Sequence, residues 1–181
     1  MHFRFDPDKT LQAIGVLLEA DDGRMGYLRL LKLLYITDRE LLAESGRTLT
    51  GDRAVAMKNG PVLSHVYDTI KGQTSCADTW FQFIHKQGYK IVLKQPPGRG
   101  KLSKREVAKL VEVSDRFNQL EDFDLAEQTH LLEEWRKNYH EGTSTPIPWQ
   151  DALLAQNRAD LIPIAEADAA TRASIDAVFG S

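Results

Sequence analysis

Apolar residues recur at helical spacing over two stretches of the first fifty residues. Residues 11–20 carry them along one face, which predicts a helix with Asp8 or Thr10 as its N-cap. Residues 27–44 are apolar over far more than a single stripe. A helix that is apolar on several faces must be covered by other elements, so we expect this second helix to lie at the centre of the core.

One acidic residue interrupts the leucine face of the second predicted helix. Asp38 lies four residues after Leu34 and three before Leu41, so it points along the same face as those leucines. An unpaired carboxylate in that position would be very costly. We therefore expect a structural Asp38, held by a basic side chain or by backbone N–H groups, and keep a functional role as the alternative.

The period changes to two near residue 80, which predicts strands. In residues 80–84, Phe81 and Phe83 alternate with Trp80, Gln82 and Ile84, and residues 89–93 alternate likewise after a short connector that contains Gly88, a pattern typical of a β-hairpin. Tyr89 is expected to pack against the helices together with the apolar residues of its strand. Because two strands alone are marginal in water, residues 54–57 are the expected third strand of this sheet.

A turn motif follows that third strand. Asn59 and Gly60 suit a tight turn, and Pro61 suits the first position of a helix, where its missing N–H does no harm. The apolar stripe of that helix includes Tyr67, which we expect to be a core residue with a polar tip.

The second half of the chain is predicted to be mostly helical. Ser103 and Glu106 have the spacing of a capping box and begin a helix that continues to about residue 119. Further helices are expected at 123–138, 151–155 and 163–179. The sequence thus predicts an α+β fold: one mostly helical domain over residues 1–181, with a small antiparallel sheet (a hairpin near 80–94 and a strand near 53–57) and a helical C-terminal part from about residue 142.

Composition narrows the class of protein. The 181 residues carry a net charge of −3, are 42% hydrophobic and include one cysteine. These values are typical of a globular domain that needs no disulfide. The first residues lack the apolar segment of a secretory signal, and charged residues interrupt the most apolar stretch. We therefore expect a cytoplasmic protein with no membrane partner.

Charge is segregated along the second half. Residues 86–109 contain 8 basic and 1 acidic residue, whereas residues 112–141 contain 9 acidic and 3 basic residues. The basic segment includes a hairpin aromatic, an arrangement that can stack bases and hold phosphates. A nucleic-acid-binding regulator that uses residues 86–109 is therefore the alternative function, although the near-neutral sum of charges and the lack of an evident helix-turn-helix argue against nucleic acid as a partner.

Catalytic and metal-binding patterns are weak. His130 with Glu133 and Glu134 comes nearest to a metal site, but a zinc site needs three well-placed protein ligands, so these are interpreted as solvated surface groups. Cys76 has no neighbouring base or nucleophile signature. We expect no catalytic residue, no metal and no cofactor, and hence not an enzyme, with a hydrolase centred on Asp38 or His130 left as the remote alternative.

Three ordered motifs, in contrast, are distinctive. They are the helical run KLLYITDR at residues 32–39, the linker GRTLTGD at residues 46–52, and NGPV at residues 59–62 followed by Val66 and Tyr67. In this order and spacing they resemble the Panacea domain of the SocA-like antitoxin family. Thr129 and His130 are similar to a later pair of that family, whereas the Pro-Trp pair that usually follows closely is displaced to Pro148 and Trp149.

The resemblance implies a bacterial or phage antitoxin that neutralises its cognate toxin, encoded nearby, by direct protein–protein binding, with delivery to a cellular protease as a further step left open. It implies no catalysis. The motif residues divide into two groups. Asp38, Gly60, Pro61 and Tyr67 are expected to hold the structure. The polar residues of the loops and strand ends are expected to contact the partner, as exposed loops on a rigid scaffold commonly do; they are Arg47, Asp52, Arg53, Lys58 and Asn59.

Overall fold

The computed structural model describes residues 1–179, so the predicted domain end at residue 181 lies outside the described residues. The elements in chain order are α1 (Pro7–Ala20), β1 (Arg24–Gly26), α2 (Tyr27–Ser45), β2 (Ala54–Met57), β3 (Gly60–Leu63), α3 (Ser64–Ile70), α4 (Ala77–Phe83), β4 (Ile84–Gln87), β5 (Lys90–Leu93), α5 (Lys104–Arg116), α6 (Asp122–Thr129), α7 (Glu133–Asn138), β6 (Thr145–Ile147), α8 (Trp149–Ala155), the 3₁₀ turn η1 (Ala159–Leu161) and α9 (Ile162–Phe179). This is the α+β class that the sequence predicts.

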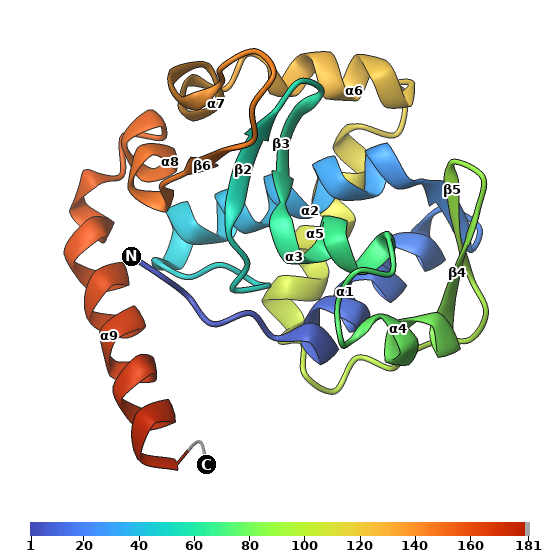
Figure 1. The fold of residues 1–181 in the computed structure, drawn as a ribbon, viewed down its shortest axis with the longest axis horizontal. Coiled ribbons are helices and arrows are strands. Elements are labelled where there is room, and N and C mark those ends of the chain that lie inside the picture. Colours follow the sequence, from blue (N-terminus) through green and yellow to red (C-terminus); the bar gives the residue numbers. More distant parts are fainter. Residues whose placement is uncertain (180–181) are drawn as a thin grey trace.

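Helix α2 is central, as expected from its apolar width. It passes behind the β2–β3 hairpin and packs on α5, α6, α8 and β3 (Figure 1). Leu30, Leu33, Leu34 and Leu42 are completely buried. At about 1.5 to 3 kcal/mol for each fully buried leucine, this one helix supplies a large share of the hydrophobic stabilisation. The helix ends at Gly46, whose left-handed φ of 74° closes the last turn.

The start of α1 differs from the prediction. Asp6, and neither Asp8 nor Thr10, is the N-cap, and its carboxylate accepts a hydrogen bond of 2.9 Å from the Lys9 backbone N–H. The reason is Pro7, which occupies the first helical position, where a proline is favoured.

The strands form two small sheets rather than one. β2 is a strand, as predicted, but it pairs with β3 and β6 in the order β3-β2-β6. The β4–β5 hairpin takes β1 as its third strand, in the order β1-β5-β4. Both sheets are antiparallel. The expectation that residues 54–57 join the hairpin is therefore wrong, because β1 leads directly into α2 and lies beside β5.

Pro61 lies in a strand and not at the start of a helix. It belongs to β3, at the edge of its sheet, where a residue without an N–H is tolerated. The turn before it is confirmed, with Gly60 at a φ of 92°. Helix α3 begins only at Ser64.

The predicted hairpin is shorter than expected. Residues 80–83 belong to helix α4, and the hairpin spans only residues 84–93. A short aromatic run fits either a strand or a helix, and Trp80 settles the choice by burying its ring and donating its indole N–H to the Pro7 carbonyl at 3.1 Å. Gly88 has the expected left-handed φ of 62°, but Tyr89 follows it in the turn and is 81% exposed, so the prediction that Tyr89 packs inward is wrong.

The helices after residue 100 are mostly as predicted. The capping box of Ser103 and Glu106 is confirmed, and α5 ends at Arg116. The single helix expected over residues 123–138 is divided into α6 and α7 by a turn at residues 130–132. The loop after α7 contains strand β6, which the sequence did not reveal. Among the helices of residues 1–179, none is both long and apolar enough to cross a bilayer.

Candidate partner-binding surface

Asp38 fixes the linker between α2 and β2. Its buried carboxylate accepts hydrogen bonds from the Leu49 N–H at 2.7 Å and the Thr50 N–H at 3.0 Å, and the Thr50 hydroxyl donates to its second oxygen. Burial raises the pKa of Asp38 to about 7, although these hydrogen bonds act in the opposite direction. The linker that carries Arg47 is thus held to the core helix by backbone donors.

Asp52 fixes the start of α3. Its buried carboxylate accepts hydrogen bonds from the His65 N–H at 3.1 Å and the Val66 N–H at 2.9 Å, and lies 2.8 Å from the His65 Nδ1. Unlike the exposed members of the predicted partner-binding set, Asp52 is buried, and its side chain is enclosed by the backbone that it orders.

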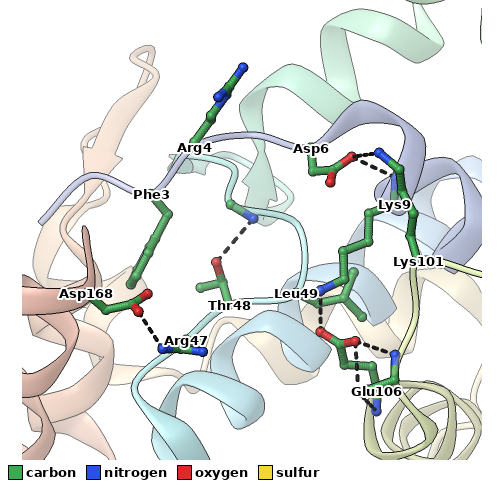
Figure 2. Close-up of a pocket in the computed structure, with 12 residues that line it drawn as sticks. Phe3, Arg4, Asp6, Lys9, Arg47, Thr48, Leu49, Lys101, Glu106 and Asp168 are labelled. Carbon is green, nitrogen blue, oxygen red and sulfur yellow. Dashed lines mark hydrogen bonds and ion pairs between the residues drawn. The ribbon is translucent and has the colours of Figure 1, made fainter. Parts of the chain in front are cut away.

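Arg47 reaches the surface beside a polar cavity of about 430 Å³ between the N-terminal segment, the linker, the start of α5 and α9 (Figure 2). Its guanidinium is 2.5 Å from Asp168. The two lysines of the cavity are paired as well, Lys9 with Glu106 at 2.6 Å and Lys101 with Asp6 at 3.3 Å. These three cations are therefore matched by carboxylates of the chain itself.

Lys58 and Asn59 are exposed at the β2–β3 turn, on the rim of a second, smaller cavity of about 110 Å³. Half-buried Tyr27 and Tyr67 complete the rim. Gly60 lines this cavity, where a Cβ would stand 2.2 Å from the Thr129 hydroxyl oxygen. The turn therefore needs glycine here both for its φ and for its close approach to α6.

Lys32 lies at the base of the smaller cavity and is fully buried. Its ammonium donates to the Pro61 carbonyl at 2.8 Å and makes no ion pair within residues 1–179. Burial lowers its pKa to about 7. In the sequence Lys32 stood out only as part of a motif. Its neighbours at helical spacing, Leu28 and Ile36, are apolar and would have indicated a buried lysine.

Arg53 is exposed in a third place. It lines a shallow hollow of about 240 Å³ together with the first two residues and the 146–150 segment. The predicted partner-binding residues therefore do not form one patch. Arg47, Arg53 and the Lys58–Asn59 pair occupy different hollows, and the last of these is lined by tyrosine rings that carry lysine ammonium groups.

Glu134 is a second buried charge that was not expected from the sequence. It was interpreted as a solvated surface group, but it is 1% exposed, lies 2.5 Å from Arg39 Nε and accepts a hydrogen bond of 3.0 Å from the Tyr35 hydroxyl. Burial, and then the Glu134 charge, raises the pKa of Tyr35. The displaced Trp149 stacks on Tyr35 at 5.9 Å, so this residue of the C-terminal part packs on the core of the motif region.

The histidine that came nearest to a metal ligand packs on an aromatic ring. His130 stacks on Trp135 with ring centroids 4.3 Å apart. Within residues 1–179 no group of three or more His, Cys, Asp and Glu side chains gathers where it could hold a metal ion.

Comparison with known families agrees with the resemblance noted in the sequence. The family model described as the antitoxin SocA-like, Panacea domain matches residues 30–136, which is more than half of the chain and runs from α2 into α7. The chain belongs to this family of antitoxin domains. No curated protein and no solved structure gives a significant match.

Proposed function

We propose that this protein is an antitoxin that silences a toxin encoded beside it by direct binding in the cytoplasm, without catalysing a reaction. The observation that carries the proposal is the match of residues 30–136 to the SocA-like antitoxin domain. The same segment contains a hydrogen-bonded scaffold, in which buried Asp38 and Asp52 hold the loops that present Arg47 and Arg53 to solvent.

Rigidity supports a binding function. A loop that is already ordered loses little conformational entropy when a partner docks, so more of the contact energy appears as affinity. Arg47, Arg53, Lys58 and Asn59 all leave this ordered backbone toward solvent. A stable complex would bury about 1,200 to 2,000 Å² in total, which is enough to include one of these hollows and its surroundings. Occlusion of the toxin and its delivery to a protease both require this binding step.

The ion pairs of the basic segment argue against the alternative function, a nucleic-acid-binding regulator. Within residues 86–109, Arg99, Lys101, Arg105 and Lys109 each pair with a carboxylate of the chain. Half of the 8 basic residues are therefore already neutralised, whereas nonspecific nucleic-acid binding needs free cations along the phosphate backbone.

The test is expression of the adjacent gene in a bacterial host, alone, with this protein, and with an unrelated folded protein of similar size. We expect growth arrest in the first and third cultures, rescue in the second, and co-purification of the two products at a fixed stoichiometry. A neighbour that is harmless alone, or that stays toxic while this protein is abundant and folded, contradicts the proposal.

A further inference from the structure

Many cations of this protein face carboxylates, but three lysines near the smaller cavity do not. The paired cations include Lys9, Arg29, Arg39, Arg47, Arg99, Lys101, Arg105, Lys109, Arg116, Lys137 and Arg158. Lys58, Lys71 and Lys86 are exposed and make no ion pair with any residue in the described part of the chain. Charge without an internal counterpart is charge that a partner can match.

Tyrosines bring these three lysines together. Lys71 Nζ lies 4.9 Å from the centroid of the Tyr67 ring, and Lys86 Nζ lies 5.3 Å from that of Tyr27. Tyr27 and Tyr67 both line the cavity whose rim carries Lys58. Exposed Tyr89, at the tip of the β4–β5 hairpin, stacks on Tyr27 with centroids 6.3 Å apart. We call this set the tyrosine–lysine face: Tyr27, Tyr67, Tyr89, Lys58, Lys71 and Lys86.

The cavity in this face is the right size for a side chain. Its volume of about 110 Å³ is well below the roughly 300 to 1,000 Å³ of pockets that hold small molecules. Its walls include Leu28, Leu31 and Val62, with Lys32 at the base, and no carboxylate is among its described lining residues. A negatively charged side chain entering here would pass Lys58 at the rim, contact apolar walls along its stem and approach Lys32 with its tip.

We propose that the tyrosine–lysine face is the docking site for an acidic segment of the toxin, with one Asp or Glu side chain inserted into the cavity and neighbouring carboxylates paired with Lys58, Lys71 and Lys86. This deepens, and rests on, the proposed antitoxin function. The tyrosines supply buried contact area at little entropic cost, as aromatic residues at the centre of interfaces commonly do. The lysines supply charge complementarity and faster association.

An acidic protein segment fits this face better than a nucleic acid does. A strand of nucleic acid needs a cationic track for several successive phosphates. Here the positive charge is bounded by α6, which packs against α2 and β3 and carries Asp122, Asp124 and Glu127. Asp122 lies beside Gly26, directly before Tyr27, but is paired with Arg29, so the remaining negative charge on this side comes from exposed Asp124 and Glu127. A phosphate backbone leaving the cavity in that direction would meet negative charge.

The experiment measures binding of the co-purified neighbouring gene product by calorimetry to the wild-type protein and to charge-reversal variants. The triple variant Lys58→Glu, Lys71→Glu, Lys86→Glu is expected to bind at least about 100-fold more weakly, because like charges then face each other. Lys86→Glu alone is expected to weaken binding about tenfold. Lys104→Glu, an equal charge change at an exposed, unpaired lysine of α5 in the described chain, is the matched control and should bind within about twofold of wild type.

The outcomes are separable. If wild type does not bind the neighbouring product, the proposed antitoxin function fails. If wild type binds and the folded triple variant, judged by its circular dichroism and melting temperature, binds within about threefold of it, the docking site is wrong while the function stands. Should the triple variant not fold, the neutral Lys→Gln series at the same positions gives the same comparison. Tight binding of a single-stranded 20-nucleotide DNA by wild type, lost in the triple variant, would reassign this face to nucleic acid.

Discussion

The charged side chains at the two ends of α2 differ in the partners that they find within the chain. Toward its C-terminus, buried Asp38 accepts three hydrogen bonds, and Glu40 and Glu44 are bound by cations of α5, with Lys109 Nζ at 3.1 Å and 2.8 Å from them. Toward its N-terminus, on the side of the cavity, Lys32 has one carbonyl acceptor and no carboxylate within the described residues. The carboxylates at the first end have their donors within the chain, whereas Lys32, beside the cavity, has no counter-ion among the described residues.

The pKa values show the physical consequence of this difference. Burial alone would raise the pKa of Glu40, but hydrogen bonds from Arg116 and Lys109 lower it overall. The hydrogen bond from Arg105 lowers the pKa of Glu44. At Lys32 only burial acts, and the pKa falls to about 7. A charge network that stabilises its own ions contributes to folding, while a buried ion without a counter-ion opposes it.

The largest expected effect is therefore at Lys32. Its pKa of about 7 in the folded chain lies below the 10.5 of an ordinary lysine. Between these values the unfolded chain binds the extra proton, so stability rises with pH across this window, and at pH below 7 the full penalty of a buried charge is present. A tenfold difference in proton affinity corresponds to about 1.4 kcal/mol, which gives up to about 5 kcal/mol across the window.

Lys32→Met should remove this dependence. The two proteins are unfolded with urea at several pH values, and the difference in free energy of unfolding is plotted against pH. We expect the variant's gain in free energy of unfolding over wild type to be greatest at pH 7 and below, and to shrink toward pH 10.5. If the free energies of unfolding of the two proteins differ by the same amount at every pH in this range, burial does not lower the pKa of Lys32.

A smaller loss of stability is expected at the opposite end, from Asp38→Ala. The substitution leaves the Leu49 and Thr50 N–H groups without their acceptor, and should lower the free energy of unfolding by about 1 to 3 kcal/mol. Asp38→Asn, which keeps one acceptor oxygen, is the matched control and should lose less. An Asp38→Ala protein of unchanged melting temperature that no longer neutralises the toxin would place Asp38 on the working surface instead.

Substitution by alanine at two lysines, one beside each end of α2, compares the two ends directly. Lys109→Ala leaves Glu40, Glu44 and Glu112 without a shared cation, and is expected to lower the free energy of unfolding by about 1 to 2 kcal/mol with toxin affinity unchanged. Lys58→Ala should change stability by less than about 0.5 kcal/mol and weaken toxin binding. Chemical denaturation and calorimetry of both variants check this, and equal stability losses would remove the contrast.

The smallest effect is on association kinetics. Lysines without internal partners should steer an acidic partner, so raising salt from about 50 to 500 mM should slow association of the wild type about tenfold. The variant with Lys→Gln at positions 58, 71 and 86 should show a much weaker salt dependence. Stopped-flow fluorescence measures both rates, and identical salt dependence would contradict steering by these lysines.

The helices could be predicted from the sequence because the patterns that indicate a helix are local. The width of the apolar face predicted the central α2, and Ser103 with Glu106 predicted the start of α5. The β4–β5 hairpin was predicted from local alternation, but the long-range strand pairings could not be predicted, because they depend on distant neighbours: β1 pairs with β5, and β6 pairs with β2, across long stretches of the chain. Local alternation around Trp80 fitted a strand equally well until burial decided for a helix.

The sequence predicted only part of the candidate surface. The motif located the β2–β3 turn and hence Lys58, but it also assigned Asp52 to the surface, although that carboxylate holds the start of α3. Lys71 lies in a segment that no motif marks, and Lys86 was marked only as the first residue of the basic segment 86–109. They join Lys58 only because Tyr67 and Tyr27 lie on the same cavity.

Amide hydrogen exchange of this protein, alone and in complex with the neighbouring gene product, tests the proposed docking face most directly. We predict slower exchange on binding at the β2–β3 turn around Lys58 and at the β4–β5 hairpin tip around Tyr89, with α5 (Lys104–Arg116) unchanged. Protection confined to α5 and the polar cavity beside Arg47, with both hairpin tips unaffected, would contradict it.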